Sequence, residues 1–404
     1  MMYFMEIKPT IGVFFGSRSP EHDVSIITAT LAISGLKDLG YNVVPVYIAK
    51  DGAWYIDESL SDLNFFKDKN YKEKLKNLGG WSLSLEKAKK QIVFNKGALF
   101  KKEIKIDIAF PAIHGRNGED GTLQGLFEIV GVPYVGCGVL SSALAMDKVA
   151  TKELYEHYGI PTTEFVSFYK RDWDKHKEDI NNEIKKIPLP VFVKPARTGS
   201  SIGITKVKEE KDLSIAIEVA FHFDSKILVE RGVGNMADLT CSVIGHSNLE
   251  VSLVQESLYS KDMFSYDDKY IEGGGAQTGE DKKSFSIPPK NIEDKTIEKI
   301  QIFSKSIFEL FGCSGIARID FLYDRDTKRI YANEINTLPG TLYHHLWKET
   351  GVNFSMLLSK LIESALEKYK EDDIITTSFE SRILDGADSS KLANKLQGNK
   401  NTIN

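Results

Sequence analysis

Cysteine is scarce in this chain of 404 residues, which contains Cys137, Cys241 and Cys313. The three lie far apart and form no CxxC pair, so they fit neither a disulfide framework nor a zinc site. No apolar run approaches the roughly 18 residues that a membrane-spanning helix needs. The first apolar stretch, residues 11–15 (IGVFF), is too short for the core of a signal peptide. We therefore expect a cytoplasmic protein with reduced thiols.

The chain also lacks a strong excess of either charge. Its 52 Lys and Arg residues against 57 Asp and Glu residues leave a formal net charge of −5, which argues against binding to nucleic acid or to a membrane surface. Hydrophobic residues make up 42% and charged residues 27% of the chain, as in ordinary globular proteins. This length exceeds what one compact core usually serves, so we expect two or three domains.

Strand and helix patterns alternate in the first third of the chain. Residues 11–15 and 43–48 have the composition of strands, and residues 23–39 between them have helical periodicity. A strand, a helix and a strand at this spacing predict a βαβ unit and therefore a parallel sheet. We further expect a lysine-rich surface excursion of hairpins and loop over 51–105, a strand over 106–113 and a helix over 123–130.

Short strands and glycine turns predominate after residue 190. Predicted strands at 191–194, 203–207, 227–230 and 239–244 surround a predicted helix at 212–221, a pattern typical of an α+β module. Helices are expected before it at 152–158 and 169–186. A polar loop at 260–283, a helix at 292–311, a strand pair and a helix at 354–370 follow. The predicted domains are 1–147, 148–240 and 241–371, and residues 372–404 are expected to be a disordered tail.

The strongest local signal is a predicted β-hairpin of residues 315–322 and 329–336. Because successive side chains of a strand alternate between faces, Arg318 and Asp320 share one face, and Glu334 and Asn336 share one face of the partner strand. If the connecting loop has an odd number of residues, pairing about Thr327 sets Arg318 opposite Asn336 and Asp320 opposite Glu334. The other face is then mostly apolar and is expected to pack inward; it consists of Ala317, Ile319, Phe321, Tyr331 and Ile335.

The polar face of this hairpin suggests a cation site. Two carboxylates and an amide oxygen suit a hard cation such as Mg²⁺, and an arginine beside them suits a phosphate or a developing oxyanion. The alternative is a solvent-exposed strand face with cross-strand ion pairs. The neighbouring motifs favour the cation site.

Two glycine-containing loops follow predicted strands. Lys194 ends one strand, and the loop at 197–203 offers backbone N–H groups and the hydroxyls of Ser200 and Ser201 to an anion. This loop matches neither GxxxxGK[ST] nor GxGxxG, and a simple glycine-serine turn is the alternative. The loop at 114–121 begins with His114 at an edge where parallel sheets bind ligands; a purely structural histidine is the alternative there.

Five segments, in this order, resemble the D-alanine–D-alanine ligase family of ATP-grasp enzymes. They are residues 16–25 (GSRSPEHDVS), 114–125 (HGRNGEDGTLQG), 134–148 (YVGCGVLSSALAMDK), 193–203 (VKPARTGSSIG) and 317–340 (ARIDF…NEINTLPG). The resemblance implies an α/β fold with α+β elements in the three-domain ATP-grasp architecture, in which a parallel-sheet N-terminal domain precedes two subdomains that grip ATP. It also implies ATP-driven joining of two D-alanines through an acyl phosphate, for peptidoglycan synthesis in the cytoplasm, with two Mg²⁺ or Mn²⁺ ions and a homodimeric enzyme.

Position by position, the resemblance implies roles for residues of each motif. The ATP-binding set is Lys148, Lys194, Ser201, Glu230, Asp238 and Lys269, with Glu230 and Asp238 at adenine and ribose and Asp238 in place of the usual glutamate. The metal set is Asp320, Glu334 and Asn336. The catalytic set is Glu21, which receives the ammonium group of the first D-alanine, Ser200 and Tyr270 beside it, and Arg318 with the backbone N–H of Gly340 as the oxyanion hole. The substrate set adds His114, His345 and Leu346 to Glu21.

The polar loop at 260–283 is the candidate lid. The acyl phosphate must be shielded from water, and this loop carries Tyr266, Lys269 and Tyr270. Within the family, a Lys-Tyr pair in the lid accompanies dipeptide formation, so Lys269 and Tyr270 favour an amine nucleophile over a hydroxy acid. Phe264 stands where the family usually has a tyrosine.

His345 departs from the family pattern, because a serine that holds the carboxylate of the second substrate usually stands there. A histidine binds a carboxylate better when it is protonated, so such a pocket would be pH-sensitive. Two interpretations remain open: backbone N–H groups hold the carboxylate, or the enzyme prefers another second substrate, such as D-serine. A third hypothesis is a nucleotide-binding protein without ligase activity. The presence of all the charged residues that the chemistry requires argues against it.

Overall fold

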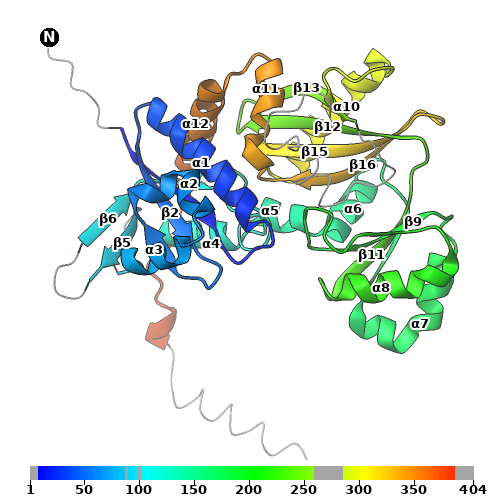
Figure 1. Ribbon diagram of the computed structural model, residues 1–404, viewed down its shortest axis with the longest axis horizontal. Coiled ribbons are helices and arrows are strands. Elements are labelled where there is room, and N and C mark those ends of the chain that lie inside the picture. The colour runs from blue at the N-terminus through cyan, green and yellow to red at the C-terminus, as the bar shows by residue number, and fades with distance from the viewer. Residues whose placement is uncertain (1–7, 87–89, 98–101, 259–284, 387–404) are drawn as a thin grey trace, which may run out of the picture. The chain divides into compact units, whose positions relative to one another are not determined.

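The computed structural model describes residues 8–86, 90–97, 102–258 and 285–386. The chain divides into two compact units, residues 1–369 and 370–404. The described residues of the first unit form four sheets with their helices (Figure 1). The second unit contains the 3₁₀ turn η4 (Ile383–Gly386). The expected disordered tail, residues 372–404, lies within this unit, and its residues 387–404 are outside the described part of the chain.

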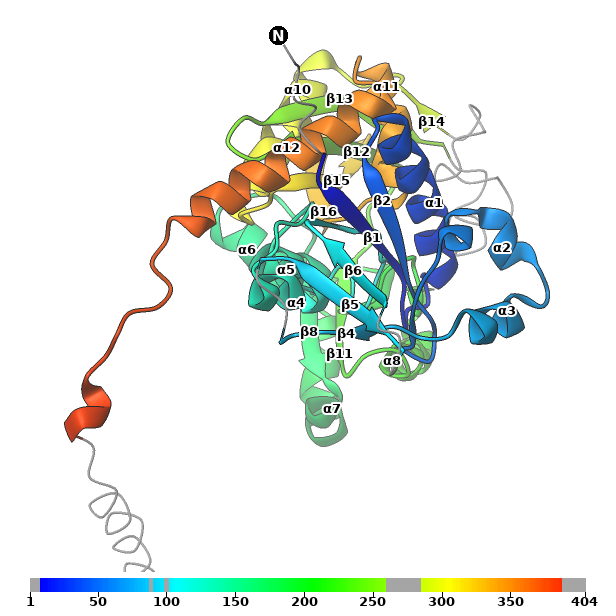
Figure 2. The ribbon, with the colours of Figure 1, turned by 90° about the vertical axis from the view of Figure 1, so that its left-hand side faces the viewer.

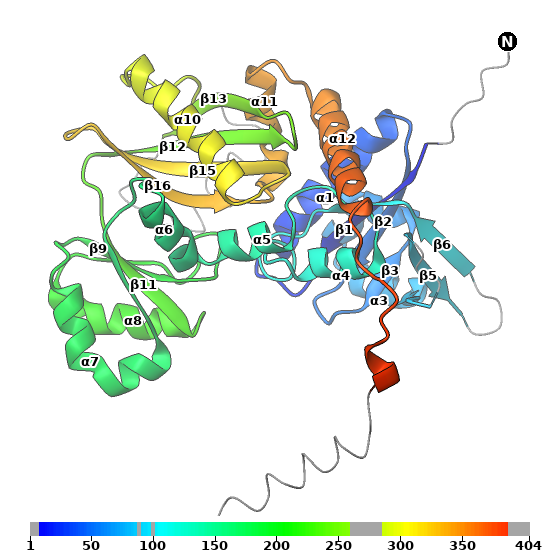
Figure 3. The same ribbon diagram turned by 180° about the vertical axis from the view of Figure 1, so that it is seen from behind.

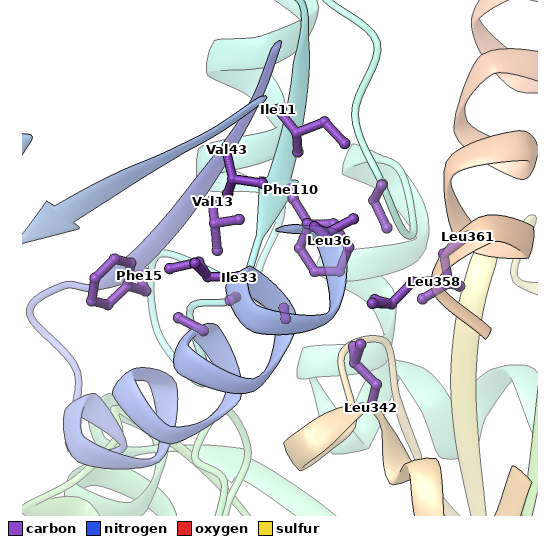
Figure 4. Close-up of a cluster of buried hydrophobic side chains, with 14 of the residues drawn as sticks. Ile11, Val13, Phe15, Ile33, Leu36, Val43, Phe110, Leu342, Leu358 and Leu361 are labelled. Atoms are coloured by element: carbon purple, nitrogen blue, oxygen red, sulfur yellow. The ribbon is translucent and has the colours of Figure 1, made fainter. Parts of the chain in front are cut away.

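The first sheet confirms the predicted βαβ unit. Strand β1 (Thr10–Gly16) pairs in parallel with β2 (Asn42–Ile48) and β7 (Ile108–Pro111), and β3 (Trp54–Ile56) adds an antiparallel edge, so the strand order is β3-β2-β1-β7. Helix α1 (His22–Asp38) connects β1 to β2. Its Ile33 and Leu36 pack against Ile11 and Val13 of β1, away from water (Figure 4). This buried apolar contact holds α1 on the sheet.

The predicted surface excursion over 51–105 is wrong for its first half, which is helical. It contains η1 (Glu58–Ser61), α2 (Leu63–Lys67) and α3 (Tyr71–Leu78). The second half forms an antiparallel sheet of β4 (Ser82–Leu83), β5 (Ile92–Lys96) and β6 (Lys102–Ile106). Helix α3 buries only Leu75 among its eight residues, so its apolar periodicity is too weak to identify from the sequence.

The second sheet is antiparallel. Helices α4 (Thr122–Val130), α5 (Val139–Met146) and α6 (Lys148–His157) lead to it from the first sheet. It consists of β8 (Phe165–Tyr169), β9 (Val191–Pro195), β10 (Thr205–Val207) and β11 (Lys226–Arg231), in the order β10-β9-β11-β8. Helices α7 (Lys170–Ile184) and α8 (Leu213–Phe221), the latter preceded by η2 (Glu210–Asp212), cover one face of it (Figure 3).

The third sheet is also antiparallel. It consists of β12 (Met236–Gly245), β13 (Glu250–Ser257), β14 (Phe285–Ser286), β15 (Gly315–Asp324) and β16 (Arg329–Asn336), in the order β14-β13-β12-β15-β16. Helix α10 (Asp294–Leu310) covers the face that carries Ile319 and Phe321. The opposite face carries Arg318 and Asp320, so this sheet presents its polar side to the candidate site.

The chain returns to the first sheet after β16. The turn η3 (Gly340–Tyr343) and helix α11 (His344–Glu349) lead to α12 (Phe354–Asp373), which lies beside α1 and β1 (Figure 2). Leu358 and Leu361 of α12 belong to the same buried cluster as Leu36 of α1 and Leu342 of the turn (Figure 4). The segment after β16 is thus held by the core of the first sheet.

The structure also bears on the cysteines and on the possibility of a membrane-spanning helix. Cys137, Cys241 and Cys313 are buried free thiols. Among the helices of the described residues, none combines the length and the apolar character that crossing a membrane requires.

Candidate active site

The predicted hairpin positions its polar residues as expected at its open end. In the pairing of β15 with β16, Arg318 lies opposite Asn336 and Asp320 lies opposite Glu334. The turn, however, does not have the odd number of residues assumed, because Asp324 pairs with Arg329 and residues 325–328 lie between them. A β-bulge between Asp320 and Phe321 inserts Asn333 on the partner strand and restores the register at the site.

Because of the bulge, the prediction that Tyr331 lies on the apolar face of the hairpin is wrong. Tyr331 pairs with Leu322, which shares the face of Arg318 and Asp320, so Tyr331 does not belong to the apolar face. Its hydroxyl lies 3.5 Å from Nη2 of Arg231. Ala332 takes the expected inward position, because it pairs with Phe321 and joins the buried cluster beneath the sheet. Strict alternation fails on β16 because the extra residue reverses the faces on one side of the bulge.

Asp320 is fully engaged by protein groups. Its Oδ2 accepts hydrogen bonds from Nη2 of Arg318 at 2.7 Å and from Nδ2 of Asn336 at 3.1 Å. Its Oδ1 accepts from Nε of Arg318 at 2.9 Å and from the hydroxyl of Thr240 at 2.9 Å. This bidentate pairing fixes the plane of the guanidinium group.

The donor chemistry of this face fits a hard divalent cation. Glu334 and Asn336 line a cavity together with Arg318, and Asp320 lies directly behind the arginine. Carboxylate and amide oxygens are the ligands that Mg²⁺ prefers. Asp320 reaches such an ion only by exchanging a contact with Arg318. Within the described residues, no three His, Cys, Asp or Glu side chains are grouped so as to hold a metal ion.

One cavity brings together predicted residues from three distant parts of the sequence. Its lining includes Glu21, His114, Lys148, Ser200, Arg318, Glu334, Asn336 and Gly340. Their motifs are separated by up to about three hundred positions in the chain, but the first sheet, the loop after β9 and the hairpin β15–β16 all end at this cavity. The remaining described members of the predicted set lie outside its lining; they are Lys194, Ser201, Glu230, Asp238, Asp320, His345 and Leu346.

Glu21 lies at the N-terminal end of α1, against two glycines. The hydroxyl of Ser200 donates a hydrogen bond to its Oε1. A Cβ atom at Gly115, whose φ is +71°, would lie 2.4 Å from Oε2 of Glu21, and one at Gly199 would lie 2.8 Å from it. Only glycine therefore allows the backbones of these two loops to approach the carboxylate so closely.

His114 and Glu119 hold protons differently in the same loop. Burial lowers the pKa of His114 to about 4, so its imidazole is neutral at pH 7. Burial and the nearby charge of Glu21 raise the pKa of Glu119 to about 8, although the backbone N–H of Gly115 donates to its Oε2 at 2.6 Å. Glu119 lines the cavity and had no predicted role. Its position inside the glycine-dense loop was the signal that could have identified it.

Lys148 enters the cavity from the first residue of α6. The side chain of Asp147 caps this helix by accepting from the backbone N–H of Val149 at 3.0 Å. Nζ of Lys148 donates to the carbonyl oxygen of Thr198 at 2.5 Å. The lysine therefore bridges α6 and the loop after β9, where an anion bound by that loop would meet a positive charge.

Lys194 and Glu230 belong to a buried charge cluster that includes Lys152, a residue absent from the predicted set. Lys194 pairs with Oε1 of Glu230, and Nζ of Lys152 lies 2.9 Å from Oε2. Burial by itself raises the pKa of Glu230, but the two lysines outweigh it and hold the pKa at about 2. The hydroxyls of Thr162 and Thr163 accept from Lys152 at 2.8 Å each. The lysine lies one helical turn after Lys148, which was its only sequence signal.

His345 is buried away from the cavity. Its Nε2 lies 2.7 Å from Oε1 of Gln255, and its ring packs against Tyr343 and Phe285. Burial lowers the pKa of His345 to about 4, so the imidazole is neutral at pH 7. The assignment of His345 to the second substrate stays a prediction, and both interpretations of its departure from the family pattern remain open. Leu346 is fully buried beside it.

The candidate lid lies outside the described residues. Phe264, Tyr266, Lys269 and Tyr270 all lie outside the described residues, which stop at 258 and resume at 285. The predicted contacts of Lys269 with phosphate and of Tyr270 with Glu21 stay predictions.

Comparison with known protein families identifies two matching regions. The family described as D-ala D-ala ligase N-terminus matches residues 10–137, and the family described as D-ala D-ala ligase C-terminus matches residues 154–363. Among similar proteins, the D-alanine–D-alanine ligase of Thermosipho melanesiensis is 39% identical over 385 residues, covering 93% of this chain and 98% of that protein. The corresponding ligase of Caldicellulosiruptor bescii is 38% identical over 388 residues, covering 92% and 99%.

Solved structures show the same similarity. The D-alanine–D-alanine ligase of Coxiella burnetii superposes with a TM-score of 0.74 at 26% identity, covering 91% of this chain and 97% of that one. The VanG D-Ala:D-Ser ligase of Enterococcus faecalis superposes with a TM-score of 0.73 at 35% identity, covering 89% and 99%. The predicted motifs therefore lie in a chain that is similar to these ligases over nearly its whole length.

Proposed function

The chain belongs to the D-alanine–D-alanine ligase family, and from that premise we propose that it joins two D-alanines into D-alanyl-D-alanine with ATP, for peptidoglycan precursors. The observation that carries the proposal is the single cavity lined by Glu21, Lys148, Arg318 and Glu334. An acceptor for an ammonium group, a cation for phosphate, an oxyanion donor and a metal-binding carboxylate meet there. These are the groups that an ATP-dependent carboxylate–amine ligase requires.

The chemistry explains why each charge is needed. A carboxylate is a poor acyl donor, so transfer of the γ-phosphoryl group of ATP first converts it to an acyl phosphate. Lys148, Lys194, Ser201 and Lys269 bind the nucleotide phosphates, and Glu230 and Asp238 bind adenine and ribose. Asp320, Glu334 and Asn336 would hold two Mg²⁺ or Mn²⁺ ions, which supply charge neutralisation during phosphoryl transfer.

The amino-acid substrates occupy the other side of the cavity. Glu21, held by Ser200 and in the closed state by Tyr270, receives the ammonium group of the first D-alanine. His114 contributes a neutral imidazole to the same wall. The free amine of the second D-alanine attacks the carbonyl carbon of the acyl phosphate, and Arg318 with the backbone N–H of Gly340 stabilises the tetrahedral oxyanion. Collapse of this intermediate breaks the bond between carbon and the phosphate oxygen, so that inorganic phosphate leaves and the amide remains. Leu346 and His345 shape the second subsite from behind, since both are buried outside the cavity lining.

Three further assignments accompany the activity. We assign three domains, 1–147, 148–240 and 241–371; the first two are supported by buried clusters that each lie within one of them. We place the reaction in the cytoplasm, supported by the scarcity of cysteine and by the three free thiols. We assign a homodimer, as the resemblance to the ligase family implies.

The decisive test measures product as well as turnover. Purified protein with ATP, Mg²⁺ and D-alanine should release phosphate in a D-alanine-dependent manner and form D-alanyl-D-alanine, detected by mass spectrometry. L-alanine should not replace D-alanine, and D-serine should compete poorly for the second position. Phosphate release that ignores D-alanine, or turnover without dipeptide, would contradict the proposal.

A matched pair of variants tests the role of Arg318. Arg318→Met should lower kcat about 100-fold or more, as loss of an oxyanion-hole donor does, while ATP binding measured by calorimetry stays close to that of the wild type. Arg329→Met removes an exposed arginine from the partner strand and should leave kcat unchanged. Equal losses in the two variants would point to a general effect of charge.

A further inference from the structure

The turn that follows Gly340 has an unusual backbone. Thr341, Leu342 and Tyr343 have φ values of 48°, 55° and 50°, so three consecutive residues with side chains adopt the left-handed conformation. This conformation brings Cβ close to the following carbonyl oxygen and is unfavourable for each of them. Three such residues in a row persist only where surrounding contacts hold them. The contacts that hold this turn therefore also set the orientation of Gly340, which lines the cavity.

Two contacts hold the turn to the first sheet. The side chain of Leu342 is buried in the cluster that includes Leu358 and Leu361 of α12 (Figure 4). The backbone N–H of Thr341 donates a hydrogen bond to Oγ1 of Thr28 at 3.0 Å, across 313 positions of the chain. Thr28 lies on α1, one helical turn after Val24, which lines the cavity, and is fully buried.

The hydroxyl of Thr28 also lies 2.8 Å from Nε2 of His114. Burial lowers the pKa of the imidazole, whereas the hydrogen bond between His114 and the backbone of Leu338 raises it, as an acceptor of the ring hydrogen does, so the ring donates to Leu338. The other nitrogen of the neutral imidazole, Nε2, then accepts from the hydroxyl of Thr28. Hydrogen bonds thus connect Thr341 to Thr28, Thr28 to His114 and His114 to Leu338, and they hold the chain on both sides of Pro339 and Gly340.

We propose that Thr28 is a positioning residue of the ligase reaction: through its hydrogen bonds to Thr341 and His114 it orients the backbone N–H of Gly340 at the cavity. The proposal rests on the proposed function, because that function makes the Gly340 N–H an oxyanion donor. Thr28 itself does not line the cavity, so it acts through the turn and through the imidazole. Without this hydroxyl, the left-handed turn loses its hydrogen bond to α1, and His114 loses its hydrogen-bond partner at Nε2.

Isosteric variants separate the hydroxyl from the bulk of the side chain. Thr28→Val removes the hydroxyl and keeps the shape, and it should lower kcat for D-alanine-dependent phosphate release at least tenfold, with the KM for ATP within about twofold. Thr28→Ser keeps the hydroxyl and should stay within about threefold of the wild type. Thr30→Val is the control, because Thr30 lies on the same helix and its hydroxyl only donates to the carbonyl oxygen of Ile26 at 2.9 Å. If Thr28→Val does not fold, Thr28→Ala carries the same test.

Two further readouts identify the route of the effect. Thr28→Val should lower kcat by a smaller factor in a His114→Gln background than in the wild type, since the hydroxyl acts partly through the imidazole and partly through Thr341. In hydrogen-exchange mass spectrometry, Thr28→Val should also accelerate exchange of the peptides covering 337–346 at least tenfold, whereas Thr30→Val should not.

The outcomes distinguish this inference from the proposed function. A wild-type protein that forms no dipeptide refutes the proposed function, and the exchange measurement then decides whether Thr28 holds the turn. With an active wild type, kcat of Thr28→Val within about twofold overturns the inference. A Thr28→Ser variant as slow as Thr28→Val also overturns it, because the hydroxyl would then be irrelevant.

Discussion

At the scale of single residues, the buried charges are where one side chain matters most. Glu230 and Lys152 are almost completely shielded from water, and Lys152 makes hydrogen bonds to Glu230, Thr162 and Thr163. A buried ion pair adds little net stability, but removal of one partner leaves an uncompensated charge in the interior. Because Lys194 still pairs with Glu230 when Lys152 is removed, Lys152 is expected to contribute to stability rather than to chemistry.

This expectation gives a stability prediction. Lys152→Met should lower the free energy of unfolding by about 1–3 kcal/mol, because Oε2 of Glu230 and the hydroxyls of Thr162 and Thr163 lose their buried partner, while Lys194 still balances the charge of Glu230. Glu230→Gln in the same background should deepen that loss, because Lys194 is then left as an unpaired buried charge. Urea denaturation at pH 7 measures both, and Lys170→Met, which removes an exposed ion pair with Asp174, should leave the unfolding midpoint unchanged. A Lys152→Met variant as stable as the control would show that the contacts of Lys152 with Glu230, Thr162 and Thr163 do not stabilise the fold.

His345 gives a prediction for pH dependence. Its folded-state pKa of about 4 lies below the value of 6.5 expected for an unfolded chain, so the unfolded state takes up the proton first as pH falls. The corresponding stability is complete above pH 6.5 and is lost as pH falls toward 4. Between pH 7 and pH 5 this amounts to about 2 kcal/mol.

The variant His345→Phe isolates this contribution. In this variant an aromatic ring without a titratable nitrogen replaces the imidazole that packs against Tyr343 and Phe285. Between pH 7 and pH 5, the free energy of unfolding of the variant should therefore fall about 2 kcal/mol less than that of the wild type. The KM for the second D-alanine should depend on pH in the same way in the wild type and in the variant, because no step near pH 6.5 is expected from His345. Parallel stability curves for the two proteins would mean that His345 titrates normally.

At the scale of elements, the bulge on β16 determines which residues face the site. Strand alternation predicts the faces of Arg318, Asp320, Glu334 and Asn336, because these four lie on one side of the bulge. Beyond it, Ala332 rather than Tyr331 faces the apolar layer. Local sequence does not reveal the bulge, because Asn333 is compatible with a regular strand or a loop, and only the pairing with β15 shows that it is the extra residue.

A pair of aspartate substitutions tests this register. Ala332 is 1% exposed in the layer beneath the sheet, so Ala332→Asp should cost about 3 kcal/mol or more of unfolding free energy. Asn333→Asp, at the partly exposed bulge, should cost less than about 1 kcal/mol. Thermal and urea unfolding report both. If Asn333→Asp were instead the less stable variant, β16 would alternate regularly, as pairing about Thr327 predicts, and the bulge would be wrong.

At the scale of the whole molecule, the described end of the chain changes character within α12. Leu358 and Leu361 belong to the core of the first sheet, whereas Ile374, Ile375, Phe379 and Leu384 are between 61% and 84% exposed. The division into compact units falls between residues 369 and 370. The helix is thus part of the fold up to about that point.

Truncation and a core substitution separate the two parts. Removal of residues 374–404 should change the free energy of unfolding by less than about 1 kcal/mol and leave D-alanine-dependent turnover unchanged. Leu358→Ala should cost about 3 kcal/mol, since it leaves a cavity between α12 and α1. A truncated protein as unstable as Leu358→Ala would show that the tail contributes to the core.

The sequence by itself determined the order of the motifs, the parallel first sheet, the family resemblance and the shared face of Arg318, Asp320, Glu334 and Asn336. Each of these depends on neighbouring residues, through periodicity, turn composition or motif spacing. Tertiary structure alone decided the partner of Lys152, the burial of His345, the bulge at Asn333 and the contact of Thr28 with Thr341. These features arise between segments up to 313 positions apart, where packing and desolvation, not local pattern, select the contact.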